Sequence, residues 1–202
     1  RRLSLQTIPN GHGSIQIAIR DGSNLDSTPL VICDAAILRT KPPEHLDLSQ
    51  VAARCDQDRW HSPDGFLEQD FMDFGQRWAN MKCAAFGQGE ALVELELHSQ
   101  FSSDLDTYGL HPALLDMATG GVQKLIPGVD LSREFYVPLS YDSVQIYGQM
   151  PAHVFSHVRC LPGSGDGLAY FNITLTDGSG IVFAEIARFT MKRLASDDAF
   201  AS

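Results

Sequence analysis

Alternating apolar and polar positions recur along the chain and predict antiparallel β-structure. Between residues 14 and 20, Ile15, Ile17 and Ile19 alternate with polar or small residues, which is the period of a strand with one buried face. Residues 91–98 show the same alternation, with glutamates on the opposite side. A strand of this kind has one face in the core and the other in water.

The same pattern, read with its turns, predicts an α+β fold. Residues 3–39 contain two or three antiparallel strands, and further strands are expected at 81–86, 91–98, 135–147, 154–161, 168–176 and 181–194. The turn Asp177-Gly178-Ser179-Gly180 indicates a hairpin between the last two. A short helix is expected over 66–80, and a second begins at Pro112. Strands followed by a helix and more strands indicate one helix wrapped by an antiparallel sheet.

The second helix carries the candidate chemistry. Pro112 suits the first turn of a helix, since its φ is preset and it has no N–H to leave unpaired. The residues after it are good helix formers and almost entirely apolar, with Asp116 as the exception. We therefore expect a buried helix and a desolvated Asp116, whose carboxyl group would favour its protonated form and could act as a general acid. The alternative is that Asp116 only stabilises the positive end of the helix dipole.

Composition narrows the function classes. The 202 residues are 44% hydrophobic and 20% charged, with a net charge of −10 and no basic cluster, which disfavours nucleic acid and anionic membranes as partners. The four cysteines form no CxxC pair, so we expect reduced thiols and no zinc site. There is no GxGxxG or P-loop motif, no signal peptide and no apolar run long enough to span a bilayer, so a cytoplasmic protein without a nucleotide cofactor is expected.

Three motifs carry a resemblance to a known family. His111-Pro112-Ala113-Leu114-Leu115-Asp116 resembles the HPALLD signature of the dehydratase domains of modular polyketide synthases. Phe74-Gly75-Gln76-Arg77-Trp78 is similar to the glycine-aromatic segment that opens the second hotdog of those domains, and Tyr136-Val137-Pro138-Leu139-Ser140-Tyr141 is similar to the strand beside their substrate tunnel. The match covers about residues 71–194.

The resemblance implies a double-hotdog fold and a division of the chain. Residues 1–40 would be the closing strands of an incomplete N-terminal hotdog, 41–65 a surface linker rich in proline and charge, 66–194 the C-terminal hotdog and 195–202 a frayed tail. A hotdog without its helix leaves an apolar sheet face uncovered, so a missing N-terminal segment or another partner is expected to cover it.

The resemblance also implies an activity, the elimination of water from a β-hydroxyacyl thioester. The substrate would be presented on the phosphopantetheine of an acyl carrier protein, with no other cofactor and no metal. Asp116 would be the catalytic acid, and His111, Pro112, Gly120, Tyr136 and Pro138 would bind substrate. Neighbouring synthase domains and a homodimer mate are further expected partners. Two of these residues have structural alternatives, since His111 could simply order its turn and a Tyr-X-Pro sequence is also typical of an edge strand.

Two departures from the family pattern leave alternatives open. None of the seven histidines (His12, His45, His61, His98, His111, His153, His157) begins the HxxxGxxxxP motif that supplies the base in the family. His12 is expected in a solvated turn and His157 in a structural strand position. Many family members place Gln or His four residues after the aspartate, where this chain has Gly120. A non-catalytic scaffold, or an isomerase or thioester hydrolase of the same fold, are the competing interpretations.

Overall fold

The computed structural model describes residues 2–11, 13–22, 24, 26–38, 40–43, 45–62 and 74–194. The chain divides into two compact units, Arg1–Lys41 and Pro42–Ser202, which are described separately. Within the described ranges, no helix is long and apolar enough to cross a membrane.

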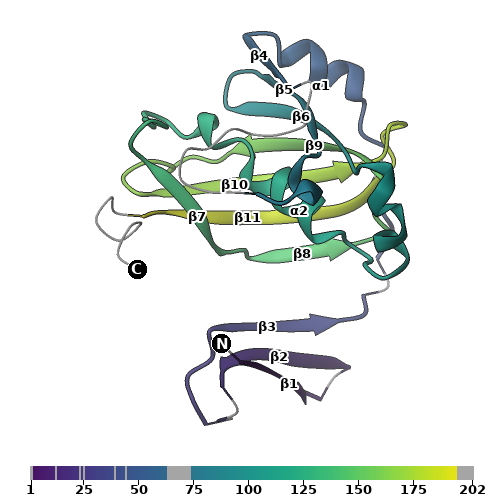
Figure 1. The fold of residues 1–202 in the computed structure, drawn as a ribbon, viewed down its shortest axis with the longest axis vertical. Helices are drawn as coiled ribbons and strands as arrows, with labels where there is room; N and C mark the ends of the chain where they lie inside the picture. Colours follow the sequence, from purple (N-terminus) through teal and green to yellow (C-terminus); the bar gives the residue numbers. More distant parts are fainter. Residues whose placement is uncertain are drawn as a thin grey trace. The chain divides into compact units, whose positions relative to one another are not determined.

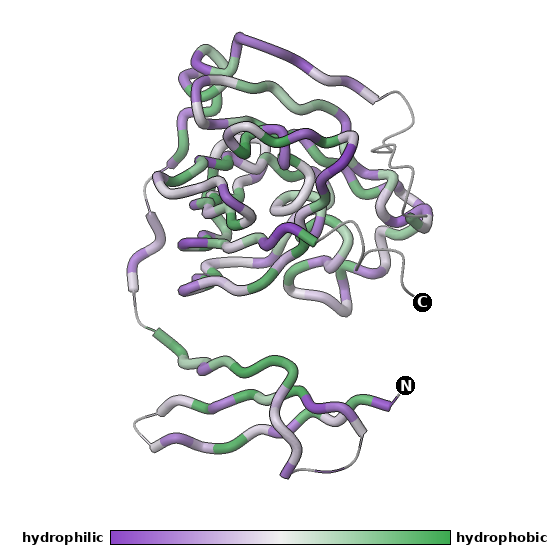
Figure 2. The backbone as a smooth tube through the Cα atoms, turned by 90° about the vertical axis from the view of Figure 1, so that its left-hand side faces the viewer, coloured by the Kyte–Doolittle hydropathy of each residue, from purple (hydrophilic) through white to green (hydrophobic). Residues whose placement is uncertain are grey.

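The first unit is a three-stranded antiparallel sheet in the order β1-β2-β3, formed by β1 (Leu3–Pro9), β2 (Ser14–Asp21) and β3 (Val31–Ala36). The register places Ile19 between Leu5 and Val31, so these three share a face. Figure 2 shows apolar and polar positions mixed along β1 and β2, whereas β3 is mostly apolar. The strands predicted in this segment are confirmed. Leu5 is 66% exposed and Val31 49%, so no element of this unit covers the apolar face that they share.

The second unit is built on an eight-stranded antiparallel sheet (Figure 1). Its strands are β4 (Asp58–His61), β5 (Met81–Phe86), β6 (Glu90–Glu96), β7 (Phe135–Ser140), β8 (Ser143–Ile146), β9 (His153–Cys160), β10 (Leu168–Thr176) and β11 (Val182–Leu194). They are ordered β4-β5-β6-β9-β10-β11-β7, and β8 also pairs with β11. The predicted strand at 135–147 is two strands, since β7 and β8 pair with different parts of the long β11.

Helix α2 (Pro112–Gly120) lies against β6 and β9 and forms the main core with the sheet (Figure 1). The apolar face of the helix meets alternate positions of the central strands, including Val93 on β6, Val158 on β9 and Phe171 on β10. The buried Ser156 hydroxyl on β9 donates to the carbonyl of Ala118, 2.7 Å away, and so fixes the helix on the sheet. The α+β arrangement of an antiparallel sheet around a helix is confirmed.

The opposite face of β5, β6 and β9 is covered by α1 (Leu48–Arg54), within the segment expected to be a linker. Asp47 caps this helix by accepting from the backbone N–H of Gln50 at 3.0 Å. Val51 and Cys55, one helical turn apart, are buried against Ala85 and Leu92 in a second apolar cluster. The described part of 41–65 therefore differs from a surface linker, because its apolar residues at helical spacing have a sheet face to cover and β4 joins the sheet.

The short helix expected over 66–80 is a single 3-10 turn, η1 (Gln76–Trp78), in its described part. Gly75 before it is extended, and Ala79 after it leaves the helical region, so no further turn is added. Residues 66–73 of that prediction, the predicted tail 195–202 and His12 lie outside the described residues. Two more 3-10 segments complete the unit, η2 (Ser99–Asp106) and η3 (Gln123–Leu125).

A charged network holds α1 to the sheet. Arg54 on α1 makes two hydrogen bonds to the Glu90 carboxylate, of 2.7 and 3.1 Å, and the buried His157 lies 2.7 Å from the same group. The Arg54 guanidinium lowers the pKa of Glu90 to about 2, whereas burial lowers the pKa of His157 below its ordinary value. His157 is therefore neutral and donates a hydrogen bond to a carboxylate whose charge Arg54 balances, which is the structural role expected for it.

This network makes stability fall with acidification. Below pH 6.5, the unfolded chain binds a proton at residue 157 that the folded chain resists, so the free energy of unfolding falls as the pH is lowered. We expect that loss to reach up to about 1.4 kcal/mol per pH unit from this one site. His157→Gln keeps a donor for Glu90 and should remove this slope, as measured by urea unfolding between pH 7 and about 5. Equal slopes in both proteins would contradict the assignment.

Two adjacent glycines at the end of α2 provide a matched test of its packing. A Cβ at Gly121 would lie 2.7 Å from the backbone oxygen of Met117 and would also meet the Met81 methyl group, whereas a Cβ at Gly120 would have no atom within 4 Å. We expect Gly121→Ala to lower the free energy of unfolding by about 1–3 kcal/mol. Gly120→Ala should leave it unchanged or slightly higher, since alanine favours the helix. Similar losses in the two variants would show that the helix end is not packed as described.

Candidate active site

The N-terminus of α2 is ordered by His111, which is only 1% exposed. Its Nδ1 accepts a long hydrogen bond from the backbone N–H of Leu114, 3.4 Å away, and Pro112 occupies the first turn, where no N–H is needed. Because Nδ1 is the acceptor, Nε2 is the nitrogen that can donate, and it points to Asp104 at 3.4 Å. Both nitrogens have partners within the fold, which is the contact pattern of a helix-ordering residue. A role of His111 in substrate binding stays a prediction.

Asp116 is exposed on α2, and the expectation that it is buried is wrong. The residues that α2 buries are Ala113, Leu114, Met117, Ala118 and Thr119, of which the first four lie at helical spacing on one stripe. Asp116 falls outside this stripe, and the helix is therefore amphipathic rather than apolar on all sides. The packing of α2 on the sheet leaves this carboxylate exposed. Its contacts with other elements therefore decide what it can do.

One such contact comes from the segment at 74–78. The indole Nε1–H of Trp78 donates to Asp116 Oδ2 at 2.7 Å, a short hydrogen bond to a carboxylate oxygen. The Trp78 ring is half-buried and stacks on Phe74, with ring centroids 6.3 Å apart. Two stretches that the sequence singled out separately, one aromatic and one on the helix, therefore meet at this carboxylate.

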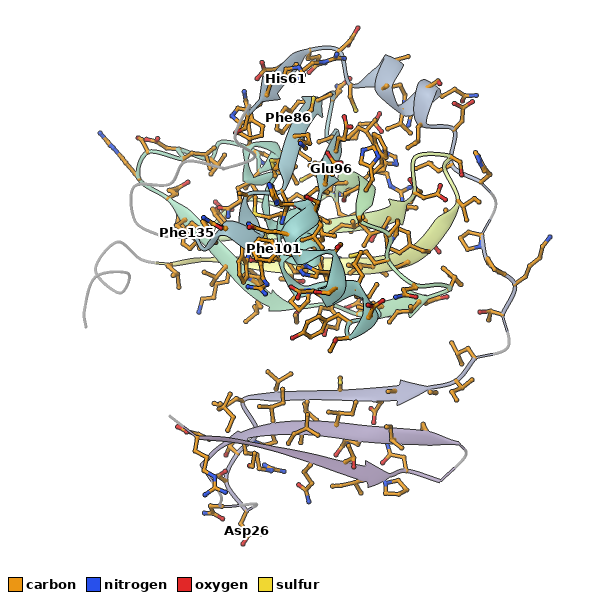
Figure 3. The ribbon with its side chains drawn as sticks, turned by 45° about the vertical axis from the view of Figure 1, so that its right-hand side comes forward. Asp26, His61, Phe86, Glu96, Phe101 and Phe135 are labelled. Carbon is orange, nitrogen blue, oxygen red and sulfur yellow. The ribbon has the colours of Figure 1, made fainter. Side chains whose placement is uncertain are left out.

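The same segment is tied to the first turn of α2 at two further points. The buried Asn80 amide donates to the carbonyls of Arg77 and Ala113, at 2.8 and 3.2 Å. Arg77 forms an ion pair of 2.7 Å with Asp104, the carboxylate that also faces the capping histidine, and lowers its pKa. The Arg77 guanidinium lies 4.4 Å from the ring centre of Phe101, labelled in Figure 3. These contacts fix Trp78 over the exposed side of the helix.

Gly120, one turn beyond Asp116, has no side chain to offer that carboxylate, and the space around it is open. Thr119 directs its hydroxyl to backbone carbonyls of the helix, that of Leu115 at 2.9 Å being the nearer. Gln123 is committed elsewhere, since its amide makes two 3.0 Å hydrogen bonds with the backbone of Tyr136. Its distance from Asp116 along the chain predicted that it could not replace a partner at position 120.

Tyr136 and Pro138 lie on β7, at an edge of the sheet. Tyr136 is 3% exposed and belongs to the main core, where burial raises the pKa of its phenol. Pro138 is exposed and pairs in register with Met191 of β11. This is an edge-strand position in which proline is tolerated. The assignment of Tyr136 and Pro138 to substrate binding stays a prediction.

The described part of the chain thus presents one exposed carboxyl group with one oxygen held by an indole. The oxygen that is not held by the indole can accept a hydrogen bond from a substrate hydroxyl and exchange a proton with it. The described residues contain no group of three or more His, Cys, Asp or Glu side chains that could hold a metal ion. Among the described residues, Asp116 has no histidine partner, and the two buried histidines, His111 and His157, contact other residues of the fold.

Sequence reasoning missed Arg77, Asn80 and Asp104 as supports of the site. Apart from the local hydrogen bond between Asn80 and the Arg77 carbonyl, the partners that tie these residues to the site lie between 7 and 33 residues away along the chain, so no local spacing predicts them. A weak signal existed for Asn80, because an amide placed directly before a buried strand needs hydrogen-bond partners.

Comparison with known proteins shows the family of the chain. The family model described as "Polyketide synthase dehydratase N-terminal domain" matches residues 42–200, most of the chain. Polyketide synthase PksN of Bacillus subtilis is 22% identical over 187 residues, and polyketide synthase PksM of the same organism 20% over 205. The matches cover 88% and 96% of this chain but only 3% and 5% of those much longer proteins.

Solved structures show the same fold. A trans-AT polyketide synthase dehydratase domain from Brevibacillus brevis has a TM-score of 0.77 at 19% identity, covering 94% of this chain and 68% of that one. The dehydratase domain from the CurK module of the curacin polyketide synthase has a TM-score of 0.78 at 22% identity, covering 98% and 69%. The hotdog arrangement of sheet and helix agrees with these structures, and the family match extends over most of the sequence. The chain belongs to the polyketide synthase dehydratase family.

Proposed function

We propose that this chain is the acid-bearing part of a dehydratase that removes water from a β-hydroxyacyl group carried as a thioester on an acyl carrier protein. The observation that carries the proposal is the exposed Asp116 on the helix of a hotdog in a chain of the dehydratase family. The carboxyl group is open to a substrate on one side and held by Trp78 on the other.

The proposed reaction needs two groups of opposite duty. A base takes the α-proton, the electron pair forms the new carbon–carbon double bond, and the β-carbon–oxygen bond breaks. Hydroxide is a poor leaving group, so Asp116 gives its proton to the departing oxygen, which leaves as water. Each group of such an acid–base pair contributes about 10²–10⁴-fold to the rate.

We assign the base to a histidine outside these 202 residues. Solved structures of CurK dehydratase include two mutants described as inactive, one replacing a histidine with phenylalanine and one replacing an aspartate with asparagine. In that relative, the histidine precedes the aspartate by more positions than separate Arg1 from Asp116 here. A preceding segment of the same polypeptide is the proposed source, and acyl carrier protein and neighbouring synthase domains are the proposed partners.

We also retain the assignment of 66–194 to the C-terminal hotdog and of 1–40 to the closing strands of the first, although the matching family model is described as an N-terminal domain. Two observations support the assignment. The second unit has both a sheet and its helix α2, whereas the first unit has three strands with an open apolar face. The chain also spans only 68–69% of the solved dehydratase domains that it matches.

The test is Asp116→Asn in the complete dehydratase domain. Asparagine keeps the shape of the side chain but has no transferable acid proton, so we expect dehydration to slow by about 10²-fold or more. The loss of water from a β-hydroxyacyl carrier protein is followed by intact mass. Asp142→Asn, at an exposed aspartate between β7 and β8, is the matched control and should react like the unchanged domain.

An unchanged rate in folded Asp116→Asn would reject the proposal. The open position at Gly120 and the lack of the HxxxGxxxxP motif in this sequence favour a non-catalytic scaffold as the second candidate. That candidate predicts no loss of water even in the unchanged complete domain.

A further inference from the structure

Trp78 makes a directed hydrogen bond to Asp116 in addition to its packing contacts. The indole ring is half-buried, yet its one polar atom is aimed at Oδ2 of an exposed carboxylate, 2.7 Å away. An indole N–H can only donate, so it engages Oδ2 as an acceptor and leaves Oδ1 as the oxygen that can carry a transferable proton. The contact therefore distinguishes the two oxygens of the carboxyl group.

The indole is held in this position from both sides. On its N-terminal side, Phe74 stacks on its ring. On its C-terminal side, the buried Asn80 binds the carbonyl of Ala113, three residues before Asp116 on the same helix. The ion pair of Arg77 with Asp104 fastens the segment a third time. A donor that is locked by its surroundings loses little entropy when it binds, and it holds its acceptor in one orientation.

The helix offers no alternative donor at the spacing where one would act. A side chain four residues after Asp116 would lie one turn along on the same face, but that residue is Gly120. Within the part of the chain that the structure describes, the indole of Trp78 is the side-chain donor on this carboxylate.

We propose that Trp78 is the positioning residue for Asp116, orienting the carboxyl group so that Oδ1 faces the β-hydroxyl of the substrate. The inference rests on the proposed function. Trp78 acts through Asp116 and does not itself exchange a proton. Its removal should therefore slow the chemical step more than it weakens substrate binding.

The first experiment measures kcat and KM of Trp78→Phe in the complete dehydratase domain. Phenylalanine keeps an aromatic ring for Phe74 but has no N–H, and the loss of one hydrogen bond to the Asp116 carboxyl group should lower kcat up to about tenfold with little change in KM. Trp60→Phe is the matched control, since Trp60 lies on β4 and is the other tryptophan of this chain. We expect it to keep the unchanged kcat.

A second experiment tests the contact without any reaction. The indole signal that disappears from a ¹H–¹⁵N spectrum in Trp78→Phe identifies Trp78. In Asp116→Ala, which removes the acceptor, this signal should shift and its proton should exchange faster with water, while the Trp60 signal stays in place. An unmoved Trp78 signal would overturn the inference.

The outcomes separate this inference from the proposed function. If Asp116→Asn is inactive and Trp78→Phe keeps the kcat of Trp60→Phe, Asp116 remains the acid and the positioning role of Trp78 is rejected. If Asp116→Asn is as active as the unchanged domain, the proposed function itself fails.

Discussion

The burial of one stripe of α2 against the central strands is the constraint on which the site depends. Leu114, Met117 and Ala118 enter the main core, and the Ser156 hydroxyl fixes the helix at the Ala118 carbonyl. With that stripe committed to the sheet, Asp116 must point away from it. Glycine is required at the end of the helix, because Gly121 lies against the Met117 carbonyl with no room for a side chain.

The polar contacts of the second unit are divided between the two faces of its sheet. On the face covered by α1, Arg54, Glu90 and His157 form a closed network whose members satisfy one another. On the α2 side, Trp78 reaches a carboxylate that stays exposed. Buried polar groups normally find partners within the fold. The Asp116 carboxylate is exposed and can still bind a ligand, whereas His157 under α1 has its partners within the fold. We therefore assign His157 a structural role and keep Asp116 as the candidate acid.

The sequence was most informative where the physics is local. The strands expected at 81–86, 154–161, 168–176 and 181–194 match β5, β9, β10 and β11 closely, and Pro112 marked the start of α2. It failed where long-range packing decides. The composition of α2 suggested burial on all sides, but Pro112 and Asp116 are exposed while the other residues of the helix are buried or half-buried. The proline-rich stretch before α1 suggested a linker, although Asp47 and the spacing of Val51 and Cys55 carried a helix signal. The hydrogen bond from Trp78 to Asp116 joins residues 38 positions apart, and no local sequence pattern predicted it.

Asp116 is proposed to supply a proton to the leaving hydroxyl. A change of leaving group on the substrate tests this role. A β-chloroacyl thioester can eliminate without an acid, because chloride departs unprotonated, whereas a β-hydroxyacyl thioester cannot. The measurement is the ratio of elimination rates of the unchanged domain and Asp116→Asn with each substrate. If Asp116 is the acid, the unchanged domain should be about 10²-fold or more faster than Asp116→Asn with the hydroxyl substrate, and about equally fast with the chloride. Equal ratios for both substrates would contradict the role of Asp116 as the acid.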